Sequence, residues 1–307
     1  MRCVILRGRG FLGRHVGQAM AAAGHEVWSV DQDPVVSMSA LPWLEGDIVG
    51  DYTDVDEWVS VSGVPDVLVH LASSTVPATA NADAIQDAEI NLVGTLKLLS
   101  SLRALQIRPR VLFASSGGAV YGRPQRIPLT ESHPTVPLGA YGVTKVALEH
   151  HLRVEEALMG LPYRVLRLSN PFGEWQQPHG IQGVIAVFAY RALHHRALEV
   201  WGDGSVVRDF IYAGDVGAAF VAAAAHEGEA RTFNVGGGVG LSVNEIVQTL
   251  ERLLGRRVER RAMPGRPFDP PANVLDVSLA AKELGWSPVT PFEDGLRRSV
   301  EWLKSEQ

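Results

Sequence analysis

Gly8-Arg9-Gly10-Phe11-Leu12-Gly13 follows the short apolar run Cys3–Leu6 and opens a helical pattern over residues 11–23. Glycines at a turn between a strand and a helix let backbone N–H groups approach a phosphate at the helix N-terminus. Asp31 ends the next strand-like run about 20 residues further on, where a carboxylate can accept hydrogen bonds from ribose hydroxyls. Together these features predict a dinucleotide-binding turn, and an ordinary turn with a surface aspartate is the alternative.

Strand-like and helix-like segments alternate outward from this turn through the first half of the chain. The strand-like runs are apolar on both faces, which is typical of a parallel sheet covered by helices on both sides. We therefore predict an α/β fold with a doubly wound parallel sheet, whose ligands lie at the carboxyl ends of the strands. The predicted strands are Cys3–Leu6, Glu26–Val30, Val67–Leu71, Val111–Ala114 and Arg164–Leu168, and the predicted helices are Phe11–Ala23, Ala84–Leu105 and Tyr141–Met159.

Beyond about residue 170 the predicted elements become shorter and the loops richer in proline and glycine. This change predicts a dinucleotide-binding domain over residues 1–170, to which some later segments return, and a smaller C-terminal α/β region over residues 171–307 that binds the substrate. The later strands are expected at Leu198–Trp201, Val207–Tyr212 and Thr232–Val235, and the later helices at Val243–Leu254 and Pro291–Lys304.

The overall composition argues against several functional classes. The 307 residues include 34 acidic and 28 basic side chains, and a net charge of −6 gives no basic surface for nucleic acid. Cys3 is the sole cysteine, which excludes an intrachain disulfide, and His150-His151 and His194-His195 lack a third metal ligand at suitable spacing. The sequence has neither a signal-peptide pattern at its start nor an apolar run of membrane-spanning length. We expect a cytoplasmic protein without a metal site that binds neither nucleic acid nor membrane.

A second group of residues indicates acid–base chemistry. Tyr141 and Lys145 have the spacing Y-x-x-x-K, which places them on one face of a helix. A nearby ammonium stabilises a phenolate and so makes a tyrosine usable as base and acid. Ser115 and Ser116 follow a predicted strand, where a serine can hold the oxygen that the tyrosine deprotonates. We predict Ser116, Tyr141 and Lys145 as catalytic residues, and the alternative is a helix with a surface lysine beside a Gly/Ser-rich turn.

With these motifs the chain resembles the nucleotide-sugar epimerase/dehydratase branch of the extended short-chain dehydrogenases, along nearly its whole length. The resemblance implies a Rossmann sheet, NAD as cofactor and a nucleotide-diphospho-sugar as substrate. Further ordered segments carry it besides the glycine turn, the serine loop and the Tyr–Lys pair. These segments are Val69-His70-Leu71-Ala72, Asn91-Leu92-Val93-Gly94-Thr95, Arg167-Leu168-Ser169-Asn170-Pro171, Gly202-Asp203-Gly204-Ser205, Arg208-Asp209-Phe210-Ile211-Tyr212, Phe233-Asn234-Val235-Gly236 and Glu283-Leu284-Gly285-Trp286.

The resemblance also implies roles for individual residues. Tyr141 would be the acid/base, Lys145 its electrostatic partner and a ligand of the nicotinamide ribose, and Ser116 would hold the substrate hydroxyl. The cofactor would be bound by Gly8, Gly10, Phe11, Leu12, Asp31, Asp47, Ile48, Leu71, Ala72, Ser73, Asn91, Ser115, Tyr141 and Lys145. The substrate, with its diphosphate on arginines, would be bound by Thr75, Asn170, Val200, Trp201, Arg208, Arg266 and Asp269. The helices near residues 91–105 and 141–159 would form a homodimer.

Two arginines complicate the cofactor site. Arg7 stands where the glycine fingerprint of the family usually begins, which affects the expected phosphate geometry and cofactor preference. Arg9, or Arg7 beside it, could pair with a 2′-phosphate and so permit NADP. Asp31 would repel that phosphate, and NAD is therefore favoured.

Two smaller departures lie elsewhere. The serine loop is one residue longer than in the commonest family form, so that either Ser116 or Gly117 takes the catalytic place. We choose Ser116 because glycine supplies no hydroxyl. Gly214 replaces an acidic residue that relatives often carry before Asp215, with no evident consequence.

The chain lacks side chains that several related reactions need, and this limits the reactions that it could catalyse. Related 4,6-dehydratases carry an Asp-Glu pair before Val120-Tyr121-Gly122, where this chain has Gly117-Gly118-Ala119. Related decarboxylases carry a glutamate nearby, and C3/C5-epimerases use a cysteine, for which Cys3 is misplaced. Elimination and carbanion chemistry need such groups. We therefore predict 4-epimerisation of a UDP-hexose-type substrate through a 4-keto intermediate. A 4-ketoreductase is the alternative, followed by a 4,6-dehydratase or a regulator that binds dinucleotide without turnover.

Overall fold

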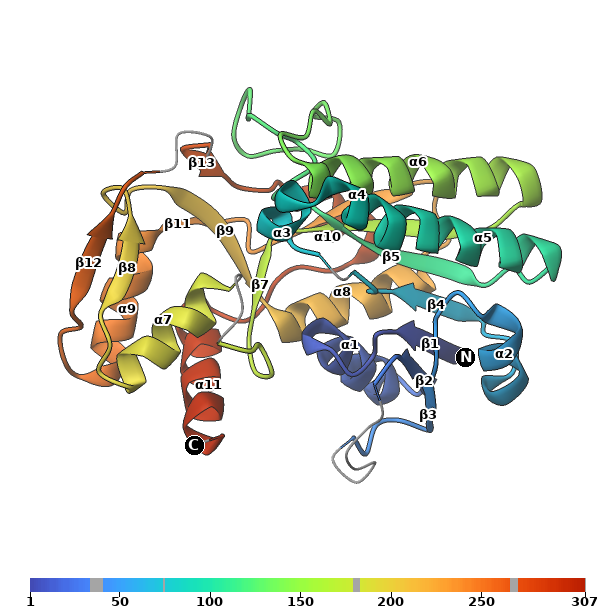
Figure 1. Cartoon of the computed structure of the whole chain (residues 1–307), viewed down its shortest axis with the longest axis horizontal. Helices are drawn as coiled ribbons and strands as arrows, with labels where there is room; N and C mark the ends of the chain where they lie inside the picture. The colour runs from blue at the N-terminus through green and yellow to red at the C-terminus, as the bar shows by residue number, and fades with distance from the viewer. Residues whose placement is uncertain (34–40, 74, 179–182, 266–269, 307) are drawn as a thin grey trace.

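A seven-stranded sheet, in which all neighbouring strands are parallel, forms the larger part of the molecule (Figure 1). The strand order β10-β6-β5-β4-β1-β2-β3 winds outward in both directions from β1 and β4. The predicted doubly wound α/β fold is thereby confirmed. The computed structural model describes residues 1–33, 41–73, 75–178, 183–265 and 270–306. The strands of this sheet are β1 (Arg2–Leu6), β2 (Glu26–Asp31), β3 (Gly46–Val49), β4 (Val67–His70), β5 (Arg110–Ser116), β6 (Tyr163–Leu168) and β10 (Thr232–Val235).

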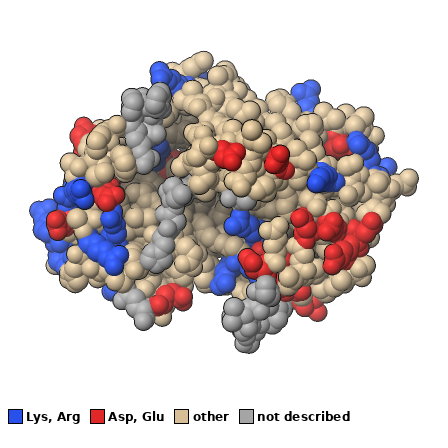
Figure 2. All heavy atoms as spheres, viewed as in Figure 1, with Lys and Arg blue, Asp and Glu red and all other residues tan. Residues whose placement is uncertain are grey.

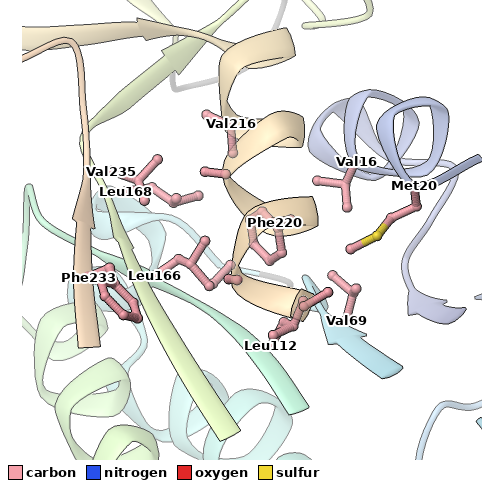
Figure 3. Close-up of a cluster of buried hydrophobic side chains, with 14 of the residues drawn as sticks. Val16, Met20, Val69, Leu112, Leu166, Leu168, Val216, Phe220, Phe233 and Val235 are labelled. Atoms are coloured by element: carbon pink, nitrogen blue, oxygen red, sulfur yellow. The ribbon is translucent and has the colours of Figure 1, made fainter. Parts of the chain in front are cut away.

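One face of the sheet is covered by α1 (Phe11–Ala22) and α8 (Ala213–Ala225). Cys3 and Ile5 of β1 point to this face, since alternate residues of a strand point to opposite sides. Because β10 and α8 both follow residue 170, the second half of the chain completes the core of the larger sheet. Figure 3 shows this core, with Val16 and Met20 from α1, Val216 and Phe220 from α8, and Val69, Leu112, Leu166, Leu168, Phe233 and Val235 from the sheet.

The opposite face is covered by α2 (Val55–Ser62), α5 (Gly94–Ala104) and α6 (Ala140–Met159). Val4 and Leu6 of β1 are fully buried against this layer. In Figure 1, α5 and α6 lie side by side along the sheet. The start of α6 thereby comes to lie near the carboxyl end of β5, where Lys145 donates a hydrogen bond to the Ala114 carbonyl.

The smaller part of the fold has its own core, built from two short sheets and three helices. β9 is the central strand of one sheet, where β7, β11 and β13 pair with it, and β8 pairs with β12 in the other. The strands are β7 (Asn170–Phe172), β8 (Leu198–Trp201), β9 (Val207–Tyr212), β11 (Gly240–Ser242), β12 (Arg260–Met263) and β13 (Ala272–Asn273), and the helices are α7 (Val184–Leu193), α9 (Val243–Leu254) and α11 (Phe292–Ser305). Short helices elsewhere are α3 (Pro77–Ala82), α4 (Ala84–Asp87) and α10 (Ser278–Leu284).

The structure corrects two expected elements. The single helix expected over Ala84–Leu105 is three consecutive pieces, α4, the π-helix η2 (Ala88–Val93) and α5. Asp47 and Ile48 belong to β3, a strand that is absent from those predicted, where Ile48 pairs with Val30 and is buried in the core. No helix formed by the described residues combines the length and apolar character needed to cross a membrane.

Candidate active site

A cavity of about 410 Å³ lies at the carboxyl ends of the central strands, facing the smaller part of the fold. In Figure 2 the surface is hollowed between the two halves of the molecule, with basic side chains beside the hollow. Residues predicted as catalytic, cofactor-binding and substrate-binding come together in this cavity. The predicted residues that line it are Phe11, Leu12, Leu71, Ser73, Thr75, Ser115, Ser116, Tyr141, Lys145 and Asn170.

Tyr141 and Lys145 enter the cavity from the first two turns of α6. The Lys145 ammonium nitrogen lies 5.5 Å from the centre of the Tyr141 ring and donates a hydrogen bond of 3.0 Å to the Ala114 carbonyl. Burial lowers the pKa of Lys145 to about 8, against the opposite effect of the Asp87 and Glu149 carboxylates. Burial, with a smaller contribution from Asp87, raises the pKa of Tyr141 to about 12. The phenol therefore retains its proton at neutral pH in this state and has an ammonium group beside it.

The two serines that end β5 have different surroundings. Both serines line the cavity, but the Ser115 hydroxyl is engaged by Glu149, to which it donates a hydrogen bond of 2.5 Å. Gly117 faces away from the cavity, because a methyl group added to it would lie 2.6 Å from the Leu275 side chain. Of the two candidates for the catalytic hydroxyl position, Ser116 is thus the one that lies in the cavity lining.

Asp87 was not predicted from the sequence. Its side chain is fully buried, and its charge acts on both Tyr141 and Lys145. Its carboxylate accepts hydrogen bonds from Thr144 at 2.5 Å, from Asn91 at 2.9 Å and from Thr75. The carboxylate thereby connects α4 with η2, α6 and the loop after β4. Its four-residue spacing from Asn91 was a weak signal, and its burial depends on packing against α6 that no local pattern shows. Glu149 had a clearer signal, because it extends the Tyr141–Lys145 spacing by four more residues.

The glycine turn between β1 and α1 has the close packing that a dinucleotide site needs. A methyl group added to Gly8 would lie 2.6 Å from the Ser29 hydroxyl, and one on Gly13 would lie 2.4 Å from two backbone carbonyls. Gly10 precedes α1 without a side-chain cap, and the first turn of α1 has no acidic residue. The helix N-terminus therefore keeps backbone N–H groups and a partial positive charge for an anion. This turn fits the diphosphate of a dinucleotide.

Asp31 lies at the end of β2, and Arg9 occupies the space next to it. The Arg9 guanidinium lies 3.2 Å from Asp31 and 3.3 Å from Asp47, and its backbone N–H also donates to Asp31 at 3.0 Å. The two contacts from Arg9 to Asp31 and the bond from Ser29 all reach Oδ2 of the Asp31 carboxylate. Arg9 therefore lies between two carboxylates.

A second cavity of about 220 Å³ continues the site towards Asp31. Predicted cofactor residues that line it are Asp31, Ala72, Ser73 and Asn91, and Arg7 lines it as well. Ser73 lines both cavities. Gly8, Gly10, Asp47 and Ile48 line neither, and Ile48 is buried in the core.

The residues predicted to bind the substrate are only partly brought together. Thr75 and Asn170 lie in the larger cavity, and the Asn170 amide donates a hydrogen bond of 2.7 Å to the Asp209 carbonyl. Arg208 lies two residues before the β9 position that pairs with Asn170, and it donates to the Val207 and Pro270 carbonyls at 2.9 and 2.8 Å. On β8, Val200 is buried in the core of the smaller part, whereas Trp201 is 40% exposed. Arg266 and Asp269 lie outside the described residues.

His, Cys, Asp and Glu side chains form no group able to hold a metal ion within the described ranges.

Comparison with known proteins identifies the family. Residues 3–236 match the sequence profile of the NAD dependent epimerase/dehydratase family. A UDP-glucose 4-epimerase from Mycolicibacterium smegmatis is 32% identical over 312 residues, which cover 100% of this chain and 99% of the relative. The structure of a Thermotoga maritima UDP-glucose 4-epimerase with UDP-glucose has a TM-score of 0.91 at 30% identity, covering 100% of this chain and 99% of that one. For a Thermus thermophilus UDP-glucose 4-epimerase in complex with NAD, the TM-score is 0.90 at 30% identity, with both chains covered completely. The chain therefore belongs to the NAD dependent epimerase/dehydratase family.

Proposed function

We propose that this enzyme catalyses the NAD-dependent 4-epimerisation of a nucleotide-diphospho-sugar of the UDP-hexose type. The supporting observation is the chemistry of the 410 Å³ cavity. Among its described lining residues, Tyr141 and Lys145 are the only ones with ionisable side chains. That lining offers no carboxylate, thiol or imidazole for elimination or carbanion chemistry. One phenol with one ammonium suits a reaction that transfers a single proton and a hydride.

The roles proposed for the three side chains follow from their positions. Tyr141 takes the proton of the sugar C4 hydroxyl and later returns it, and Lys145 stabilises the phenolate with its positive charge. Ser116 donates a hydrogen bond to the C4 oxygen, which becomes the oxygen of a transient 4-keto sugar. NAD, held by the glycine turn and the N-terminus of α1, would supply reversible hydride transfer at C4, and return of the hydride to the other face of the sugar would give the epimer.

NAD rather than NADP is the cofactor that these residues would hold. The glycine turn and the N-terminus of α1 would bind the diphosphate, and Asp31 would accept from the adenosine ribose hydroxyls. Arg9 cannot serve a 2′-phosphate without leaving Asp31 and Asp47, which lie within 3.3 Å of its guanidinium. Asp31 and Asp33 both line the second cavity, and their carboxylates would repel that phosphate.

The substrate diphosphate would lie between Asn170 and the loop that Arg208 contacts. Asn170 lines the cavity from β7, and Arg208 lies on β9, which pairs with β7. Arg208 also donates a hydrogen bond to the Pro270 carbonyl. We assign both to the diphosphate, because an arginine with an amide beside it suits phosphate oxygens. Thr75, Val200, Trp201, Arg266 and Asp269 stay predictions for the sugar and the nucleoside, as does the cytoplasmic location.

A homodimer is proposed from exposed apolar side chains on adjoining helices. Val143, Val154 and Leu158 of α6 are 55%, 46% and 64% exposed. Ile85 and Ile90 on α4 and η2, which pack against α6, are 74% and 41% exposed. A surface of this kind on neighbouring helices suits a second copy of the chain, because an isologous contact would cover the same side chains in both copies.

The reaction can be tested with purified protein and no added reductant. We expect interconversion of UDP-glucose and UDP-galactose, or of their N-acetyl forms, measured by anion-exchange chromatography. Tyr141→Phe should lower kcat by roughly 10²- to 10⁴-fold, the usual contribution of a general acid–base group, while NAD binding is retained. Tyr163→Phe is the control, since Tyr163 begins β6 at the end of the sheet away from the cavity.

Two outcomes would contradict the proposal. A product that forms only with stoichiometric NADH or NADPH would identify a 4-ketoreductase. Loss of water from the sugar would identify a dehydratase.

A further inference from the structure

Arg7 has a backbone conformation that side chains other than glycine rarely adopt. Its φ angle is +67°, in the left-handed region. The turn imposes this angle, because the Arg7 N–H donates to the Val30 carbonyl at 2.8 Å and its own carbonyl accepts from Gly10 at 3.2 Å. Strained residues of this kind concentrate at functional sites, where surrounding contacts hold them in place. Glycine would occupy this position without strain. The arginine found here therefore indicates a role for its side chain.

The Arg7 side chain crosses the groove between two strand ends. The side chain, which follows β1, passes over Gly10. A methyl group added to Gly10 would lie 3.5 Å from Cγ of Arg7 and 3.8 Å from its Nε. Its guanidinium then donates a hydrogen bond to the Ser73 carbonyl, on the loop that follows β4. The side chain is exposed and lines the 220 Å³ cavity with Asp31 and Asn91. Arg7 thus lies in the place where a dinucleotide would run from the glycine turn towards Asp31.

The charge of Arg7 is not balanced by a carboxylate of the described residues, none of which lies within 4.0 Å of its guanidinium. Ser73 offers it only a neutral carbonyl. The N-terminus of α1, directly beneath the side chain, adds partial positive charge and has no acidic residue in its first turn. An arginine side chain that passes beside a helix N-terminus suits an anion bound there.

We propose that the Arg7 guanidinium binds the diphosphate of the dinucleotide and exchanges its contact with Ser73 for phosphate oxygens. The proposal rests on the dinucleotide-binding role of this site. It assigns Arg7 to the diphosphate rather than to a 2′-phosphate, because the side chain lies over Gly10 at the N-terminus of α1. A 2′-phosphate would lie instead at the carboxyl end of β2, beside Asp31 and Asp33. Arg7 therefore supplies a positively charged side chain at a position where a glycine would offer the diphosphate only backbone groups.

Isothermal titration of nucleotide-free protein with NAD, NADP and ADP-ribose tests this assignment. Arg7→Gly should weaken the binding of all three ligands by roughly 10- to 100-fold, the usual effect of losing a charged hydrogen-bond donor. Arg7→Lys should lose less, because the charge remains while the two-point contact is lost. The melting temperature of ligand-free Arg7→Gly should not fall, since glycine relieves the strained φ angle. A loss of affinity without a loss of stability is not expected of a merely structural residue.

Gln106→Gly is the matched control. Gln106 is an exposed non-glycine residue with a φ angle of +57°, at the end of α5 and away from both cavities. It should show the same relief of strain without any change in affinity. Unchanged binding of NAD and ADP-ribose by Arg7→Gly would overturn the proposal, and so would a loss confined to NADP, which would move Arg7 to the 2′-phosphate. If the unaltered protein binds none of the three ligands, the cofactor role of the whole site fails, which is a different result.

Discussion

The guanidinium of Arg167 holds the carboxylate of Glu149 at two points, Nε to Oε1 at 3.0 Å and Nη2 to Oε2 at 2.6 Å. Both side chains are 9% exposed, and Glu149 also accepts the hydrogen bond of Ser115. The pair joins α6 to β6 and β5 one helical turn after Lys145. The catalytic end of α6 is thereby fixed to the strands that form the floor of the cavity.

Removing the charge of Glu149 should destabilise the fold. Glu149→Gln leaves the buried Arg167 guanidinium without its partner, and the free energy of unfolding should fall by about 3–5 kcal/mol. Urea denaturation measures the change. Glu156→Gln is the control on the same helix, since Glu156 pairs with Arg231 at 2.7 Å with both side chains about one-third exposed. An exposed pair of this kind contributes about 0–1 kcal/mol, so equal losses in the two variants would contradict the role of the buried pair.

Ser116 and Ser115 should respond differently to alanine. Ser116→Ala should lower kcat by roughly 10- to 100-fold, because a hydrogen bond to a developing charge is worth about 1.5–3 kcal/mol. Ser115→Ala should mainly lower stability, since its hydroxyl bonds Glu149 rather than facing the sugar. Steady-state kinetics and urea denaturation of both variants separate the two effects. A larger kinetic loss in Ser115→Ala would show that the catalytic hydroxyl has been assigned to the wrong serine.

Stability should depend on pH through Lys145. Burial lowers its pKa from 10.5 to about 8 in the folded state. Between these pH values the unfolded chain binds more protons at this position, so the contribution of Lys145 to stability rises with pH. The unfolding free energy of the wild type should therefore rise relative to that of Lys145→Met between pH 7 and pH 10. The exposed Lys97→Met is the control for general effects of alkaline pH, and a difference that falls with pH would contradict the assignment.

Asp87 should set the alkaline limit of activity. Its negative charge raises the pKa of Lys145, so Asp87→Asn should lower that pKa further. Since Lys145 must be protonated to stabilise the phenolate, kcat should decline at a lower pH in the variant than in the wild type. Rate profiles from pH 6 to pH 10 measure the shift. Asp83→Asn removes a carboxylate from the start of the same helix, where it caps the Gln86 N–H, and should leave the profile in place.

The proposed dimer can be tested on α6. Val154→Asp together with Leu158→Asp puts charges on an exposed apolar surface, which a monomer tolerates and a dimer interface does not. Light scattering after size-exclusion chromatography should show a dimer for the wild type and a monomer for the variant. Val289→Asp, at an 81% exposed position outside α6, is the control. A wild-type monomer would contradict the proposal.

Several elements could be predicted from the sequence because local pattern decides them. The bounds of β8, β9, β10 and α9 agree with those expected, since apolar runs between turn residues fix strands and a Ser-x-x-Glu capping box fixes the start of α9. The π-helical piece η2 was not predictable. Asn91 in this piece and Asp87 just before it form hydrogen bonds with Thr75 and Thr144 from other elements, which no local pattern shows.

The site was predictable to the extent that its residues are consecutive or evenly spaced. Tyr141 and Lys145 were found from their Y-x-x-x-K spacing and Ser116 from its place after a predicted strand, and the structure places all three in one cavity. The surroundings of Arg9 were not predictable, because Asp31 and Asp47 come from separate strands. Neither Asp87 nor the bond between Ser115 and Glu149 could be foreseen, since both depend on how α4 and α6 pack.

The return of α8 and β10 to the larger sheet limits how this chain can be recombined with its relatives. A fragment that ends near residue 170 would lack Val216 and Phe220, and the apolar side chains of β5 and β6 would be exposed to water. It would also leave β6 as an unpaired sheet edge. A chimaera that exchanges sugar specificity must therefore keep residues 213–235 with the first half, together with α10, whose Ala280 belongs to the same core.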